Sequence, residues 1–114
     1  MKFLEATTND GKVYKDCYFK IRTINPYNQH EELCISLYSK SEGFLTDVTC
    51  SELGNTGKKV AYVRVDPNSN IDVMKILSNH CLAMNVSTST IYYGQEYAKV
   101  VFDLDKIAEF SEIE

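Results

Sequence analysis

The chain has 114 residues, and its 12 Lys and Arg against 16 Asp and Glu give a formal charge of −4. That length is typical of one domain, and 44% hydrophobic with 25% charged residues is an ordinary globular composition. No apolar run approaches the roughly 18 residues of a membrane span. The negative charge argues against binding duplex DNA by charge alone. The N-terminus turns polar after two apolar residues, so we expect no export signal and a cytoplasmic protein without membrane contact.

Alternating apolar and polar residues predict strands in the first 65 residues. Asp-Gly at the turn over 8–11 favours a tight hairpin, and short turns make neighbouring strands antiparallel. In the strand over 12–24, Val13, Cys17 and Phe19 are expected on the buried face, and Tyr14 on the outer face. The predicted strands are 2–7, 12–24, one through Leu33, Ile35 and Leu37, one through Phe44, Thr46, Val48 and Cys50, and 60–65.

The period changes from two to about 3.6 after a proline-containing break at 66–70. Apolar residues then recur at three- and four-residue spacing, which predicts one amphipathic helix over 71–84 with its apolar face on the sheet. Ser69 with Asp72 is expected to form a capping box, and Asn85 to end the helix. The residues of the apolar stripe are Met74, Leu77, Cys81 and Met84.

A last strand and a short helix are expected after the polar loop over 87–90. Asp105 is expected to cap that helix, with Ile107 and Phe110 facing inward. The predicted fold is α+β: one domain over 1–114, with an antiparallel sheet of five to six strands, one main helix packed on one face and a short C-terminal helix. The other face is left for solvent or a partner. The residues of the last strand are Ala98, Val100, Phe102 and Leu104.

The residues that carry chemistry do not have the spacing of an active or metal site. Every gap between successive cysteines is longer than fifteen residues, whereas structural zinc sites pair ligands a few residues apart. We therefore expect reduced, mostly buried thiols. Asp103 and Asp105 are interpreted as a strand end and a helix cap, and 66–70 as a turn, because it lacks the glycine and glutamate of a calcium loop. Without a nucleophile, phosphate-loop or metalloprotease motif, we predict no enzyme, no cofactor and no metal.

Two candidate contact surfaces remain. The first is an outer face of tyrosines and basic residues, which can stack on unpaired bases and meet phosphates, anchor a protein interface, or serve only cross-strand pairing. The second is the acidic C-terminal tail, which can imitate a phosphate array or only keep the chain soluble. The first surface comprises Tyr14, Tyr18, Lys20, Arg22, Tyr62 and Arg64. The second comprises Asp103, Asp105, Glu109, Glu112 and Glu114.

Four segments carry a family resemblance. They are Cys-Ile-Ser-Leu-Tyr at 34–38, Val-Ala-Tyr-Val-Arg-Val-Asp at 60–66, Asn-Ser-Asn at 68–70 and a final strand with Phe-Asp-Leu at 102–104. In these the chain resembles a family of short proteins encoded on mobile elements of gut bacteria, domain-of-unknown-function family 4313. The resemblance implies a phage or mobile-element context and brings no catalytic residues.

The absence of enzyme motifs and this resemblance together give our functional expectation. We expect a non-enzymatic phage or mobile-element accessory protein that binds and inhibits or modulates a host protein, for example a defence nuclease. The alternative is a small protein that binds single-stranded nucleic acid.

Overall fold

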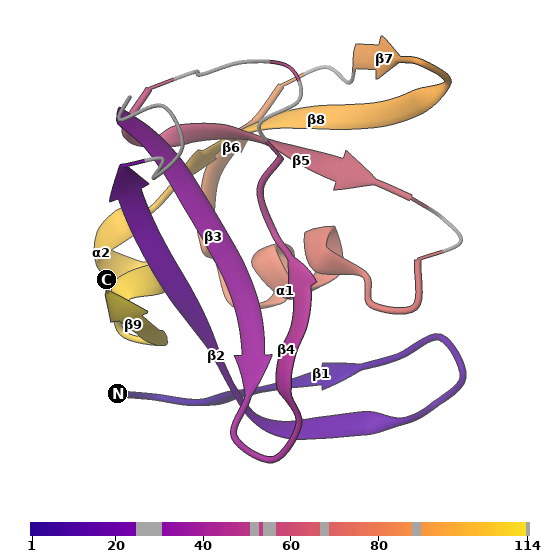
Figure 1. The fold of residues 1–114 in the computed structure, drawn as a ribbon, viewed down its shortest axis with the longest axis vertical. Coiled ribbons are helices and arrows are strands. Elements are labelled where there is room, and N and C mark those ends of the chain that lie inside the picture. The colour runs from indigo at the N-terminus through magenta and orange to yellow at the C-terminus, as the bar shows by residue number, and fades with distance from the viewer. Residues whose placement is uncertain (25–30, 51–52, 54–56, 67–68, 88–89, 114) are drawn as a thin grey trace.

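The protein is mostly β, with its strands in two sheets (Figure 1). The computed structural model describes residues 1–24, 31–50, 53, 57–66, 69–87 and 90–113. Strands make up 57% and helices 12% of the structure. The predicted α+β arrangement, with one main helix covering one face of a single sheet, is therefore wrong. The two sheets instead pack against each other, and both helices lie beside them.

The first sheet contains the N-terminal hairpins and a strand from the other end of the chain. Its four sequential strands are antiparallel neighbours in chain order, and β9 lies parallel to β2. β2 is long enough to pair with β1 through its first half and with β9 through its second. The strands are β1 (Leu4–Thr7), β2 (Val13–Ile24), β3 (Glu31–Ser39), β4 (Gly43–Asp47) and β9 (Ser111–Ile113).

The second sheet is built around β8, and all its pairings are antiparallel. β5 pairs along one edge of β8, and β6 and β7 follow one another along the opposite edge. The strands are β5 (Val60–Val65), β6 (Ala83–Val86), β7 (Thr90–Tyr92) and β8 (Gln95–Phe102). The helices are α1 (Val73–Asn79) and α2 (Leu104–Ala108), and no described helix is long and apolar enough to cross a membrane.

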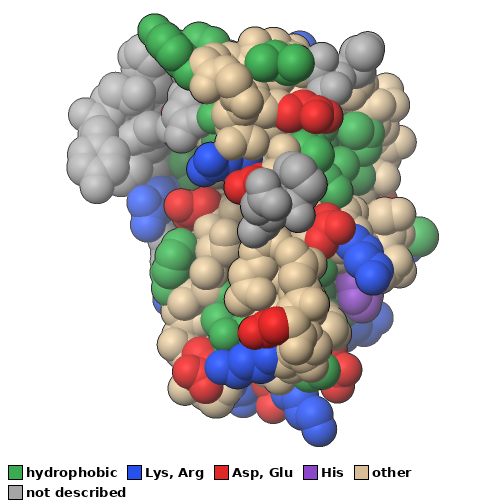
Figure 2. Space-filling view, turned by 90° about the vertical axis from the view of Figure 1, so that its right-hand side faces the viewer, with side chains coloured by type: hydrophobic (Ala, Val, Ile, Leu, Met, Phe, Trp, Pro, Cys, Tyr) green, Lys and Arg blue, Asp and Glu red, His purple; other side chains and the backbone are tan. Residues whose placement is uncertain are grey.

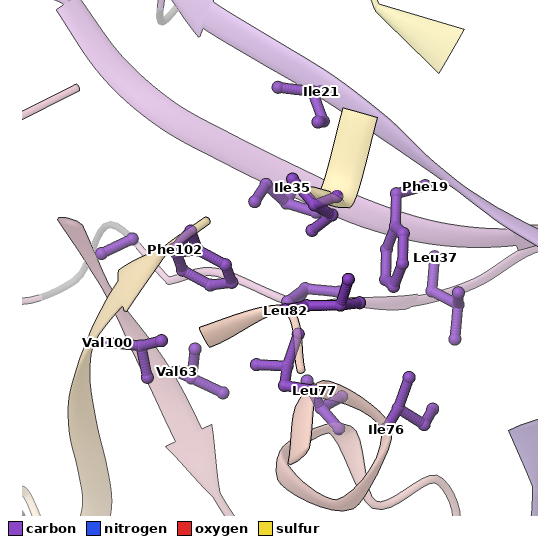
Figure 3. Close-up of a cluster of buried hydrophobic side chains, with 14 of the residues drawn as sticks. Phe19, Ile21, Ile35, Leu37, Val63, Ile76, Leu77, Leu82, Val100 and Phe102 are labelled. Atoms are coloured by element: carbon purple, nitrogen blue, oxygen red, sulfur yellow. The ribbon is translucent and has the colours of Figure 1, made fainter. Parts of the chain in front are cut away.

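The core lies between the inner faces of the two sheets (Figure 3). Phe19 and Ile35 of the first sheet and Phe102 of the second point into this space, and all three are at most 1% exposed. Leu77 of α1 and Leu82 just beyond it complete the cluster. A helix that contributes side chains to such a core, rather than covering a sheet, needs only two turns.

The helix predicted over 71–84 is half as long as expected. α1 ends at Asn79, and Cys81 adopts a left-handed conformation with φ 54°. This turn brings Leu82, which does not fit the helical stripe, to complete burial. Residues 83–86 then pair with the edge of β8 as β6, so Asn85 lies in a strand and Met84 is 69% exposed. Burial of Leu82 and a strand ladder together outweigh one more turn of helix.

The residue that caps each helix is not the one expected from the sequence. Asp72, rather than Ser69, caps α1: its carboxylate accepts a hydrogen bond from the Lys75 amide at 3.0 Å. Asp103, rather than Asp105, caps α2, accepting from the Lys106 amide at 3.1 Å. In each helix the cap is the aspartate that directly precedes the first helical residue, where its side chain reaches an otherwise unpaired amide.

A β-bulge in β2 reverses the expected faces of its first residues. Leu4 pairs with Cys17 but Ala6 pairs with Tyr14, so β2 has one extra residue between these pairs, and Asp16 there has φ 52°. Tyr14 therefore packs against the core and Val13 is 45% exposed, the opposite of the predicted arrangement. After the bulge the alternation proceeds as predicted.

Candidate binding surface

Four aromatic rings form a row across the outer face of the first sheet. We call this row the aromatic ladder, and its members are Phe3, Tyr18, Tyr38 and Phe44. The two tyrosine rings stack with centroids 5.9 Å apart and planes 26° apart. Phe3 meets Tyr18 edge-on at 6.2 Å, and Phe44 meets Tyr38 edge-on at 5.7 Å. Offset and edge-to-face contacts are the favoured arrangements of aromatic pairs.

Strand register places these rings side by side. Tyr18 of β2 pairs directly with Tyr38 of β3. Both face outward, because their neighbours Phe19 and Leu37 face the core. Phe44 pairs with Tyr38 through a register shift between β3 and β4. That shift overturns the expectation that Phe44 and Val48 share one face: Phe44 is 54% exposed, whereas Val48 is buried.

Two lysines lie over rings of the aromatic ladder. The Lys20 ammonium is 4.4 Å from the centroid of the Tyr38 ring, and the Lys40 ammonium is 4.8 Å from that of Phe3. Both distances are within the range of cation–π attraction. These contacts and the ring stacking order the side chains before any partner arrives, so that binding costs less conformational entropy.

Charges of both signs surround the aromatic ladder. β9 places Glu112 beside Lys20, and the Ser36 hydroxyl donates to the Asp47 carboxylate at 3.0 Å. Glu5 is exposed between the buried Leu4 and Ala6 of β1. The cations Lys20, Arg22 and Lys40 therefore lie among the anions Glu5, Asp47 and Glu112.

The structure brings together half of the residues predicted as a contact surface. Tyr18, Lys20 and Arg22 alternate along the outer face of β2. Tyr14 is not on this face, because the β-bulge in β2 turns it to pack against the core. Tyr62 and Arg64 belong to β5 in the other sheet, where the Arg64 guanidinium donates to the Gln95 side chain at 2.7 Å.

Sequence reasoning missed three members of the aromatic ladder. Tyr38 could have been placed from the alternation of β3, since its neighbour Leu37 is a predicted core residue. Phe3 could have been placed in the same way from Leu4. Phe44 had no such signal, because the register shift that turns it outward depends on pairing with β3.

The cysteines provide no nucleophile at this surface. All four are free: Cys17 is buried, Cys34 and Cys50 are half-buried and Cys81 is exposed, so the expectation of mostly buried thiols is wrong for Cys81. Cys34 faces outward opposite Arg22, and burial raises the pKa of its thiol. A protonated thiol is a poor nucleophile. Among the described residues no group of His, Cys, Asp or Glu is placed to hold a metal ion.

The acidic C-terminal tail is part of the folded structure as far as it is described. Ile107 is completely buried, Phe110 packs against the core, and β9 pairs with β2. The Glu109 carboxylate is 3.1 Å from the Lys2 ammonium. Glu114 lies outside the described residues. The acidic side chains therefore line a fixed helix and strand, not a frayed end.

Comparison with family models, with curated proteins and with solved structures found no match for this chain. The resemblance to the mobile-element family therefore stays an expectation from the sequence.

Proposed function

We propose that the protein is a non-enzymatic binding protein that contacts another protein through the aromatic ladder. The observation that carries this proposal is the row of four rings at an open sheet face, held in place by each other and by two lysines. Aromatic residues concentrate binding energy at protein interfaces, because they offer large contact area for little loss of conformational freedom.

The mixed charge of this face favours a protein partner over nucleic acid. A surface that follows a phosphate backbone needs an excess of positive charge, whereas here anions lie among the cations, and the whole chain carries −4. Mixed charges around an apolar centre are instead the usual composition of a protein interface. Single-stranded nucleic acid remains the second candidate, because stacked tyrosines with lysines alongside also suit unpaired bases.

We further propose that the protein acts in the cytoplasm and that the partner is a protein of the host cell, such as a defence nuclease, which it inhibits or modulates. The sequence resemblance to mobile-element proteins supports this narrower version. The free cysteines agree with a reducing compartment.

The test is capture of partners from nuclease-treated lysate of the organism that carries the gene, with tagged wild type and two variants. Tyr18→Ala/Tyr38→Ala removes the stacked pair of the aromatic ladder, and Tyr62→Ala removes a half-buried tyrosine of the other sheet as a matched control. We expect the proteins captured by wild type and by the control to be lost with the double variant. Equal capture by all three proteins would overturn the proposal.

A second measurement separates the two candidate partners. Fluorescence anisotropy with a labelled oligothymidylate is expected to show no binding at low salt. Tight binding that weakens steeply with salt, and that the double variant loses, would assign the aromatic ladder to single-stranded nucleic acid instead.

A further inference from the structure

The outer edge of the second sheet is an open strand edge with an apolar surface. β6 and β7 pair with β8 and, within the described part of the chain, with no other strand. Of the nine large hydrophobic side chains that are exposed among the described residues, five lie along this edge or at its tip. They are Met84 (69% exposed), Val86 (45%), Ile91 (74%), Tyr92 (41%) and Tyr93 (93%).

Part of this apolar surface continues the core-facing side of the sheet beyond the core. Val86 pairs with the buried Val100, so the two side chains lie on the same, inner face of the sheet. Ile91 pairs with Glu96, which is two residues before the inward-facing Ala98 and therefore on the same face of β8. Ile91 lies on that inner face as well. Figure 2 shows hydrophobic side chains at the top of the molecule, the level of β7 in Figure 1.

This edge lacks the protection that keeps strand edges apart. Residues 76–95 contain no Asp, Glu, Lys, Arg or Pro, although a quarter of the whole chain is charged. Natural edge strands are usually guarded by a charged side chain or a proline that prevents pairing with another chain. The absence of both over twenty residues leaves this edge open to pairing with another strand.

The hairpin tip supplies an independent observation. Tyr93 and Gly94 connect β7 to β8 with φ 50° and 75°, which is the conformation of a tight two-residue hairpin turn. Asn, Asp or Gly is favoured at the first of these positions, because other side chains are strained there. Tyr93 occupies it and is 93% exposed, and its ring lies perpendicular to the neighbouring Tyr92 ring, with the centroids 4.6 Å apart. A strained tyrosine that gains no burial within its own chain points to a contact outside it.

We propose that the β6–β7 edge is a homodimer interface, in which it pairs with the same edge of a second copy of this chain. The absence of charge favours this occupant: a two-fold axis places the same segment against itself in antiparallel orientation, so an edge carrying charges of one sign would face charges of the same sign. Val86, Ile91 and the tyrosine tip of one copy then pack against the edge of the other copy. This surface is on a different sheet from the aromatic ladder, so a result against the dimer leaves the proposed function unaffected, and the reverse also holds.

The test is the molar mass of the purified full chain by light scattering and sedimentation over a range of concentrations. We expect a dimer at about 100 µM that dissociates on dilution. Ile91→Lys is expected to raise the dissociation constant at least about tenfold, whereas Val13→Lys, at an exposed hydrophobic position of β2 in the other sheet, leaves it unchanged.

Tyr93→Asn separates a contact from a structural role. Asn suits the left-handed turn, so this variant should melt no lower than wild type and still dimerise about tenfold more weakly. A wild-type chain that stays monomeric at about 1 mM would overturn the proposal. So would a dimer that Ile91→Lys and Tyr93→Asn leave intact, or one that Val13→Lys disrupts equally.

Discussion

The four thiols differ in exposure, and this predicts which of them reacts in the native protein. Cys81 is exposed at the end of α1, whereas burial raises the pKa of the Cys17 and Cys34 thiols. Thiol counting near pH 8 should find one fast group, which Cys81→Ser removes, and four groups after denaturation. A fast phase that survives Cys81→Ser would show that one of the other three cysteines is accessible.

Leu77 and Met84 belong to the same sequence stripe but differ in burial, and their variants should therefore differ in stability. Leu77 is 1% exposed in the core and Met84 is 69% exposed in β6. Leu77→Ala should lower the free energy of unfolding by about 2–5 kcal/mol, the range for a well-packed leucine. Met84→Ala should change it by less than about 0.5 kcal/mol.

Urea unfolding measures both values, at a protein concentration low enough to keep the chain monomeric. Equal losses in the two variants would mean that the helix continues to Met84, as the sequence pattern alone predicts.

At the scale of a single element, the cap of α2 distinguishes two neighbouring aspartates. Asp103 accepts a hydrogen bond from the Lys106 amide, whereas Asp105 is an exposed residue of the first turn. Asp103→Ala should cost about 0.5–2 kcal/mol of stability, and Asp105→Ala clearly less, because only the first leaves an amide of the helix unpaired. Thermal unfolding of the two variants provides the comparison, and a larger loss for Asp105→Ala would contradict the assigned cap.

The elements of the first sheet also explain why the aromatic ladder is continuous. An extra residue in β2 near Asp16, and another in β4 before Thr46, change which side chains face outward. Without the first bulge, Tyr14 would point away from the core. Without the second, Phe44 would point into it. The first irregularity thus moves a residue outside the ladder, whereas the ladder itself depends on the second, which turns Phe44 outward, and not on alternation alone.

At the scale of the whole molecule, the C-terminal segment closes the fold against the N-terminal hairpin. The Lys2 amide donates to the Glu109 carbonyl at 2.7 Å, and the Phe19 amide donates to the Phe110 carbonyl at 2.8 Å. Ile107 of α2 is completely buried. Because β9 comes from the far end of the chain, no local segment beside β2 can take its place.

Removal of residues 105–114 should therefore abolish cooperative unfolding, because it deletes Ile107, Phe110 and the whole of β9. Circular dichroism during heating measures this. Ile107→Ala, a milder change, should cost about 2–5 kcal/mol. The control Glu112→Gln removes only an exposed charge and should leave the melting temperature unchanged within about 1 °C. A truncated chain that melts like wild type would contradict this role.

The strands of the first 65 residues and the outward direction of Tyr18, Lys20 and Arg22 could be predicted from the sequence by itself, but β6, β7 and β9 could not. β5 has the predicted bounds 60–65, and β2 begins one residue inside the predicted 12–24. Alternation of apolar and polar residues is local information, since each residue's face follows from its neighbour's. The short connections likewise predicted that β1, β2, β3 and β4 are antiparallel neighbours.

Only the tertiary structure decided where α1 ends, which residues complete the aromatic ladder and that the strands divide into two sheets. A helix continues only while its next turn gains more than the competing arrangement. At Cys81 the competitor is the burial of Leu82 and the edge of β8, which lies about twenty residues further along the chain. Likewise β9 and the position of Phe44 depend on register with distant strands. Periodicity along the chain reports which face a residue prefers, but not which distant partner will cover it.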